Sequence, residues 1–209
     1  MFGIGDKVVY PMHGAGIIED IEVKIILGED KKYYILNLPL KEMKVMIPFD
    51  NTEDLGLRPV VDEDKLDEVI SLLRQGLSKM NSNWNRRFRE NTDKLKTGDI
   101  LEVAEVVKNL MIMDDKKGLS TGERKMVNNS TKYLLSEMCL AKDIDMEEAK
   151  RILHDNVQIS IDQERILEKA REEAKAKAKE EAKEEAKAKE AAEKEAAEKE
   201  EAKKEEVNK

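Results

Sequence analysis

The chain of 209 residues is acidic, with 46 Asp and Glu residues against 38 Lys and Arg residues and a formal net charge of -8. Charged residues make up 40% of the chain and aromatic residues 4%, which excludes one large core and favours small compact units where apolar residues cluster. The acidic total argues against indiscriminate binding of nucleic acid by the whole molecule, because affinity for a polyanion comes from cations placed against phosphates. The acidic net charge is compatible with a local basic face.

Cysteine content and the amino terminus indicate a reducing compartment. Cys139 is the only cysteine, so neither an internal disulfide nor a thiolate metal cluster is expected, and its apolar neighbours predict a small core residue. The amino terminus lacks a basic region leading into an apolar stretch, and no segment approaches the ~20 apolar residues that cross a bilayer. We therefore expect a cytoplasmic chain with no membrane partner.

The first predicted elements are short strands between Gly5 and about Gly56, where apolar residues recur with period two. The alternation from Ile21 to Ile25 predicts half-buried positions, and residues 28–31 predict a polar turn before the next strand. A second alternating run covers residues 43–47. Strands at this spacing predict a small, strongly bent antiparallel sheet or an SH3-like barrel, with Gly14-Ala15-Gly16 as a tight turn and not a phosphate loop.

Beyond Pro59 the apolar residues change to helical spacing, which predicts a compact helical bundle. Start and stop signals predict successive helices from Asp62 to about Gly76, from residues 81–83 to Gly98, and from Asp99 to Gly118. Another helix opens with the capping box of Ser120 and Glu123, and a short last helix follows Asp145.

After about Asp162 the chain consists almost entirely of Glu, Ala, Lys and Arg. Strong helix formers with opposite charges three or four residues apart favour a solvated single helix or a flexible tail. No large apolar residue lies between Leu167 and Val207, so a coiled-coil seam is not expected. A docking surface for a partner is the alternative interpretation of this tail.

Residues for catalysis do not form a recognisable set, and we predict a protein that is not an enzyme and holds neither cofactor nor metal. His13 and His154 lie far apart in the sequence. The acidic residues from Asp143 to Glu148 suggest a calcium loop or a metal-dependent hydrolase, but the turn glycine of such a loop is missing and helix capping is the favoured interpretation.

The most informative stretch is residues 83–89, Asn-Trp-Asn-Arg-Arg-Phe-Arg, which holds the only tryptophan. Six cations between Lys79 and Lys96 face only Glu90 and Asp93, so this segment is locally basic. Arginines at the start of a helix reach successive phosphates, and an exposed Trp84 there suits a distorted minor groove. Alternatively, Trp84 and Phe88 share a buried stripe and the arginines are ordinary surface residues.

Several motifs in order along about 155 residues resemble one family. They are Val8-Val9-Tyr10-Pro11 with His13-Gly14 and Gly16, Val45 to Pro48, Asn83-Trp84 with Arg86-Arg87, Gly98-Asp99 with Val103 to Val107, and Gly118-Leu119-Ser120 with Gly122-Glu123. On these residues the chain is similar to the CarD/CdnL family of bacterial RNA polymerase-binding transcription regulators, whose N-terminal module is shared with the transcription-repair coupling factor. The charged tail lies outside the resemblance.

The resemblance implies an α+β fold with two domains, and the composition predicts a charged tail beyond them. A Tudor-like or SH3-like small β-barrel over residues 1–57 would bind the RNA polymerase β subunit. A helical domain over residues 58–161 would lie on promoter DNA at the upstream edge of the transcription bubble, and residues 162–209 would form the Glu/Ala/Lys-rich single helix or flexible tail.

Site residues follow from the same resemblance. Trp84 would be the minor-groove wedge, Arg86 and Arg87 would contact phosphates, and Asn83 and Arg89 would assist. On the polymerase side, family members often carry arginines at the positions of Lys24 and Met46; Lys24 keeps the charge and Met46 loses it. We expect polymerase contact through an exposed sheet edge that includes Lys24, Lys44, Val45, Met46 and Ile47.

The function implied is stabilisation of the open promoter complex without strong sequence specificity, by a monomer associated with the nucleoid through RNA polymerase. The alternative is an adaptor that binds polymerase through its β-domain and another protein, instead of DNA, through its helices.

Overall fold

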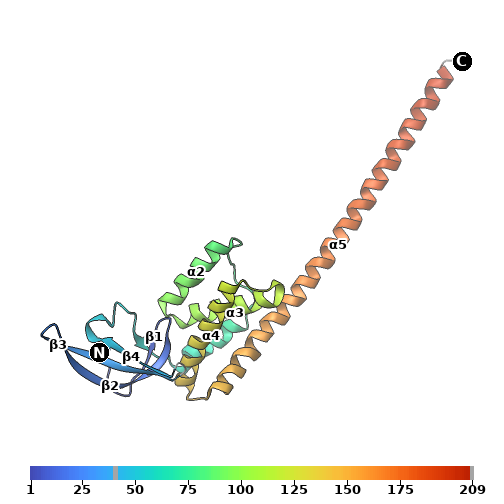
Figure 1. Cartoon of the computed structure of the whole chain (residues 1–209). Helices are drawn as coiled ribbons and strands as arrows, with labels where there is room; N and C mark the ends of the chain where they lie inside the picture. Colours follow the sequence, from blue (N-terminus) through green and yellow to red (C-terminus); the bar gives the residue numbers. More distant parts are fainter. Residues whose placement is uncertain (40–41, 208–209) are drawn as a thin grey trace. The chain divides into compact units, whose positions relative to one another are not determined.

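The computed structural model describes residues 1–39 and 42–207, in which an antiparallel sheet is followed by five α-helices (Figure 1). This confirms the predicted α+β class. The chain divides into a compact unit, Met1–Glu164, and a second unit that begins at Arg165. The first unit contains two hydrophobic cores, one in the sheet and one among the helices. The domain boundaries after residues 57 and 161 remain predictions.

The sheet has five strands in the order β4-β3-β2-β1-β5, so β4 and β5 lie at its two edges. The strands are β1 (Lys7–Tyr10), β2 (Gly14–Ile26), β3 (Glu29–Leu38), β4 (Met43–Pro48) and β5 (Arg58–Pro59), and a 3-10 turn, η2 (Phe49–Asn51), follows β4. A register shift between Ile18 and Asp20 marks a bulge in β2, which bends the strand. Tyr34 anchors the small core by stacking on Phe49, with ring centroids 3.9 Å apart.

The hairpin between β2 and β3 differs from the prediction in two respects. Its turn is the pair Leu27 and Gly28, both with positive φ, and residues 29–31 already belong to β3. Val23 and Ile25 are 57% and 77% exposed, so the expectation that they are half-buried is wrong. Both side chains lie in the outer part of the hairpin, where neither belongs to a hydrophobic core.

The first four helices begin and end close to the predicted signals. They are α1 (Glu63–Leu73), α2 (Trp84–Thr97), α3 (Ile100–Lys117) and α4 (Thr121–Lys142). Their N-caps are Asp62, Asn83, Asp99 and Ser120, each accepting a backbone N–H. Gly98 ends α2 in the left-handed region, as predicted.

The last helix, α5 (Met146–Val207), is continuous over 62 residues, so the prediction of a short final helix is wrong. Ala149, Leu153, Val157 and Ile161 place its first part in the helical core. Beyond them the strong helix formers continue the same backbone hydrogen bonding without a stop signal. Within the described residues, no helix has the length and apolar character to cross a membrane.

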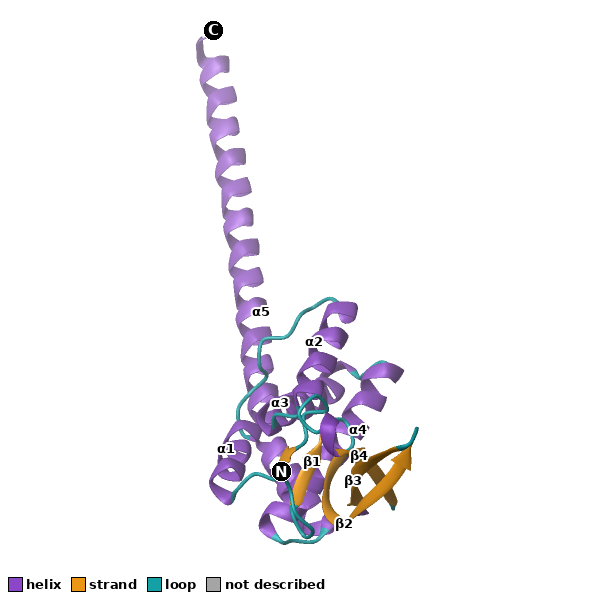
Figure 2. Cartoon of the chain, turned by 90° about the vertical axis from the view of Figure 1, so that its left-hand side faces the viewer, coloured by secondary structure: helices purple, strands orange, loops and turns teal. Residues whose placement is uncertain are grey.

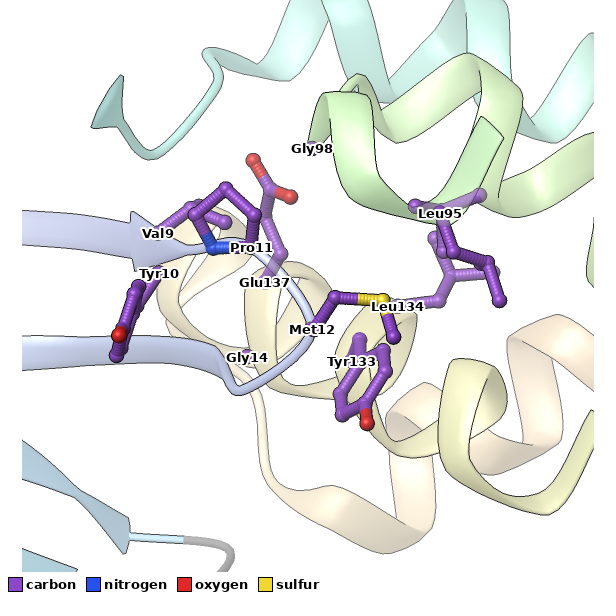
Figure 3. Close-up of a pocket in the computed structure, with 11 residues that line it drawn as sticks. Val9, Tyr10, Pro11, Met12, Gly14, Leu95, Gly98, Tyr133, Leu134 and Glu137 are labelled. Atoms are coloured by element: carbon purple, nitrogen blue, oxygen red, sulfur yellow. The ribbon is translucent and has the colours of Figure 1, made fainter. Parts of the chain in front are cut away.

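The sheet packs beside α4, at one side of the helices in the first unit (Figure 1, Figure 2). The Ala15 N–H donates to Ser136 Oγ of α4 at 2.8 Å, and a Cβ on Gly14 would lie 2.8 Å from the same oxygen. Arg58 donates from two nitrogens to the two carboxylate oxygens of Glu137, at 2.6 and 2.8 Å. Figure 3 shows the turn after β1, with Pro11 close to Glu137 and Met12 reaching toward the helices. These contacts fix the position of the sheet against α4.

Candidate nucleic-acid interface

The predicted DNA-binding stretch begins where the loop after α1 enters α2. The Asn83 side-chain oxygen accepts the Arg86 N–H at 3.2 Å, while the Asn83 N–H donates to the Asn81 side chain at 3.1 Å. These two hydrogen bonds fix the first turn of α2. Asn83, predicted to assist DNA binding, is exposed and acts here as the N-cap.

Trp84 is the first residue of α2 and is 43% exposed. Its indole N–H donates to Ser120 Oγ, the N-cap of α4, at 2.9 Å, and its ring stacks on Phe88 with centroids 5.4 Å apart. Gly122 leaves room for this pair, since a Cβ there would lie 3.3 Å from the Phe88 ring. The indole is thus held in one orientation while part of it remains open to a partner.

Arg87 was expected to contact phosphate, but the residue is buried, with only 6% of its surface exposed. Its Nε and Nη2 donate to one oxygen of Glu123 at 2.8 and 2.7 Å, and its Nη1 donates to the carbonyls of Asn81 and Ser82. All three nitrogens are engaged inside the protein. We therefore assign Arg87 to the support of the Trp84 site and not to a phosphate contact.

Glu123 connects Arg87 of α2 to Ser120 at the start of α4. One of its oxygens accepts from Arg87, and the other accepts from the Ser120 hydroxyl at 2.8 Å. Burial by itself would raise the pKa of Glu123, but the hydrogen bonds from Ser120 and Arg87 outweigh it and hold that pKa below its ordinary value. The carboxylate is therefore charged at neutral pH and fixes the ends of α2 and α4 together.

The basic character of the segment is carried by fewer residues than the sequence indicates. Lys94 pairs with Glu105 and Lys96 with Asp93 at 3.2 Å, in addition to the buried Arg87. Arg86 and Arg89 are exposed, and within the described part of the chain neither has a carboxylate partner. They remain the cations of the predicted set that can reach a phosphate.

The N-terminal ends of α2 and α4 meet at the hydrogen bond between Trp84 and Ser120. Helix N-termini carry partial positive charge, so this end of the molecule favours an anion beside the exposed arginines. An aromatic ring that is held on one side and open on the other suits contact with a base step or a groove wall. The arrangement is suited to a nucleic-acid backbone with a distorted or unstacked step.

Sequence reasoning missed the role of Ser120, Gly122 and Glu123 in this site. Their capping-box pattern predicted the start of α4, and the structure confirms that box. What the pattern did not show is that the same serine and glutamate also hold Trp84 and Arg87. The two adjacent arginines gave no signal of which one turns inward.

The predicted polymerase surface lies at the β4 edge of the sheet. Lys24 approaches the sulfur of the exposed Met46 at 3.4 Å and pairs with Glu22 at 3.3 Å. Lys44 pairs with Glu19 at 2.5 Å. All three side chains are exposed, in agreement with the alternation that the sequence shows.

The other two residues of that set, Val45 and Ile47, face inward. Ile47 is 1% exposed in the sheet core, and Val45 is half-buried against it. The side chain of Ile47 is therefore not accessible to a partner, contrary to its place in the predicted surface. The alternation along β4 sends these positions inward, and only their backbone lies along the edge. The exposed Val23, Ile25 and Leu27 were not part of the predicted surface.

The acidic run before α5 has a capping role. Asp145 accepts the Glu148 N–H at 2.8 Å at the start of α5, and Asp143 adopts the left-handed conformation that ends α4. Among the described residues, no group of three or more His, Cys, Asp or Glu is placed to hold a metal ion. His13 stacks on Tyr10 at 4.3 Å, and Cys139 is half-buried against the helical core.

Fold and site together define a small α+β protein with two separate candidate surfaces, a sheet edge and an aromatic-basic helix end. Residues 2–61 match the family described as the CarD-like/TRCF RID domain, and residues 68–154 match the family described as CarD, C-terminal domain. The chain is 43% identical over 150 residues to the putative transcription factor YdeB of Bacillus subtilis (strain 168), covering 72% of this chain and 98% of that protein. The chain belongs to the CarD family of transcription regulators that interact with RNA polymerase.

A likeness to a solved structure covers a smaller part of the chain. The 72-residue N-terminal domain of Myxococcus xanthus CarD, solved in solution by NMR, is 27% identical and covers 28% of this chain and 79% of that chain, with a TM-score of 0.25. The charged tail lies beyond the residues that the two family descriptions match.

Proposed function

We propose that this protein binds the β subunit of RNA polymerase through its sheet and promoter DNA through the Trp84 surface, at the upstream edge of the transcription bubble. There it stabilises the open complex. A relative named a putative transcription factor, matched over almost its whole length, supports a role in transcription.

The observation that carries the DNA half of the proposal is the state of Trp84. An indole that is 43% exposed, hydrogen-bonded to Ser120 and stacked on Phe88 is already oriented. It therefore loses little conformational freedom when it binds DNA. Arg86 and Arg89 supply phosphate contacts beside it. Such contacts read the shape of the groove and not base edges, so strong sequence specificity is not expected.

The protein would shift promoter opening through the difference between its affinities for open and closed promoter DNA. A wedge stabilises the open complex only if it binds melted or distorted DNA better than closed duplex. A preference of about 1.4 kcal/mol would change that equilibrium about tenfold. Attachment to polymerase would raise the local concentration of the helices at the promoter, so two weak contacts would act as one.

The sheet edge supports the polymerase half. β4 is an edge strand, and its outward Met46 lies against Lys24. Pairing of a partner strand with an edge uses backbone groups, which tolerates the methionine where family members often carry arginine. Exposed apolar residues of the β2–β3 hairpin add area beside this edge.

A pair of binding measurements tests the proposal. Trp84 is the only tryptophan, so its emission reports directly on DNA added to the protein alone. We expect quenching that is stronger with a forked promoter fragment than with closed duplex, and weaker affinity for both in Arg86→Ala. An emission unchanged by saturating DNA at low salt would contradict the DNA half and favour the adaptor alternative.

The polymerase half is tested by measuring binding of the cognate core enzyme to the native chain and to Met46→Asp. An acidic side chain at the exposed edge position should weaken binding, whereas Trp84→Ala should leave it unchanged. Equal binding by all three proteins would contradict the assignment of the β4 edge.

A further inference from the structure

An apolar groove opens beside Trp84, between α2 and α4. Gly122, the second residue after the α4 N-cap Ser120, lies in its wall, and a Cβ there would be 3.7 Å from the indole ring and 3.3 Å from Phe88. Phe88 and Leu95 of α2 and Met126 of α4 are further lining residues. Met12, whose φ of 64° is unusual for a residue with a side chain, lines it from the turn after β1.

The size of the groove suits a small flat group. Its volume is about 240 Å³, below the roughly 300–1,000 Å³ of sites that bury a drug-sized ligand. Polar atoms enter from α4, where Asn129 and Lys125 line the groove. An apolar floor with an aromatic ring, an amide and a cation is the combination that single-stranded nucleic-acid sites use to stack and orient bases.

Exposed cations lie on both helices that form the groove, and one of them, Lys125, lines it. Lys132 comes seven residues after Lys125 on α4, and Lys96 comes seven residues after Arg89 on α2, so each pair shares one face of its helix. All four side chains are exposed. Of these, Lys96 pairs with Asp93, and within the described residues no ion pair holds the other three. An apolar groove with cations on both sides matches a nucleic-acid strand whose bases turn inward and whose phosphates lie outside.

We infer that the groove between α2 and α4 binds unpaired bases of a separated DNA strand, as a continuation of the Trp84 surface. This rests on the proposed function, because promoter opening at Trp84 supplies the unpaired strand. Trp84 would hold the junction between paired and unpaired DNA, and the groove would take the nucleotide next to it. Lys125 and Arg89 would contact its phosphates from opposite sides.

The charge of the surroundings favours a strand over an apolar peptide. A hydrophobic protein segment would fit the floor but would gain nothing from the cations on either side. An acidic peptide would use both, and its binding is therefore a separate outcome of the test.

The test measures affinity for a fork that joins a promoter duplex to a short unpaired thymidine tract, and for the same fork with abasic nucleotides in the tract. Asn129→Leu removes the amide that would orient a base and leaves an apolar side chain of nearly the same shape. Asn128→Leu is the matched control, because Asn128 is exposed and lies about 100° away around α4. A closed duplex and an acidic peptide complete the series.

The native chain and Asn128→Leu should bind the fork with bases about fivefold more tightly than the abasic fork, since one stacked base contributes a gain of this order. Asn129→Leu should lose this preference and keep its affinity for closed duplex. Equal affinity for both forks with intact duplex binding would overturn the groove and leave the proposed function standing. Failure to bind any DNA would overturn both. An acidic peptide whose binding is lost in Asn129→Leu but kept in Asn128→Leu, and with which neither fork competes, would reassign the groove to protein.

Discussion

Replacing Arg87 separates two neighbouring arginines that look alike in the sequence. Arg87→Ala removes the partner of Glu123 from a pair in which the side chains are 8% and 3% exposed. Removing one member of a buried ion pair costs about 3–5 kcal/mol, because the remaining charge loses its compensation. Since a whole domain is stable by only about 5–15 kcal/mol, the variant should be marginally folded.

Arg86→Ala is the matched control. Arg86 is exposed, and its loss should change the free energy of unfolding by no more than about 0.5 kcal/mol. If it contacts one phosphate, the slope of log affinity against log salt should fall by about 0.9. Arg87→Lys keeps the charge but not the fork of donors, and should be destabilised less than the alanine variant.

Denaturant unfolding followed by far-UV circular dichroism and by Trp84 emission measures both effects. Arg87→Ala should unfold at much lower denaturant and Arg86→Ala at the native concentration, while DNA titrations show the salt slope changing in Arg86→Ala. The reasoning would be refuted if Arg87→Ala were as stable as the native chain and instead lost a phosphate contact.

Contacts at the start of α4 and at the two ends of α2 give three further predictions. Ser120→Ala removes the N-cap of α4 and the acceptor of the Trp84 indole, so it should cost about 0.5–2 kcal/mol in thermal unfolding and shift the Trp84 emission; an unchanged spectrum would contradict the hydrogen bond. Gly98→Ala places a Cβ 2.8 Å from Pro11 at a φ of 73°, so calorimetry should show a loss of about 1–2 kcal/mol or more, and a neutral effect would show that the turn can move. Because the pKa of Glu123 is lowered in the folded state, its stabilisation is present above the unfolded pKa of about 4.3 and is lost as the pH falls through the folded value. Trp84 emission should therefore stay constant from pH 8 to about 5 and change below about pH 4, and Glu123→Gln should flatten this acid dependence.

Helix boundaries were predictable because their signals are local. Asp62, Asn83 and Ser120 each stand just before a helical pattern, and an oxygen at that position satisfies backbone N–H groups that no helix can satisfy itself. Gly98 ends α2 for an equally local reason, its left-handed backbone. No knowledge of distant residues was needed for any of these.

The assignment of Arg87 failed because its cause is distant in sequence. The buried face of α2 consists of Arg87, Asn91 and Leu95, at helical spacing, and only the last is apolar. A hydrophobic pattern could not mark this face as inward. The partner that makes burial tolerable, Glu123, comes from α4.

Alternation along a strand indicates which side chains share a face and not what covers it. Val23 and Ile25 follow the period correctly, but no second layer reaches the outer hairpin and they are exposed. The same rule succeeded on β4, where Met46 points outward and Ile47 inward. Helix propensity likewise indicated a helical tail but not that it continues α5 unbroken.

Stabilisation of the open complex through Trp84 is measured by the lifetime of open promoter complexes formed with the cognate RNA polymerase, after a competitor is added. The native chain should lengthen this lifetime, and Trp84→Ala should remove the gain while still binding polymerase. An unchanged lifetime with the native protein bound to polymerase would contradict the account.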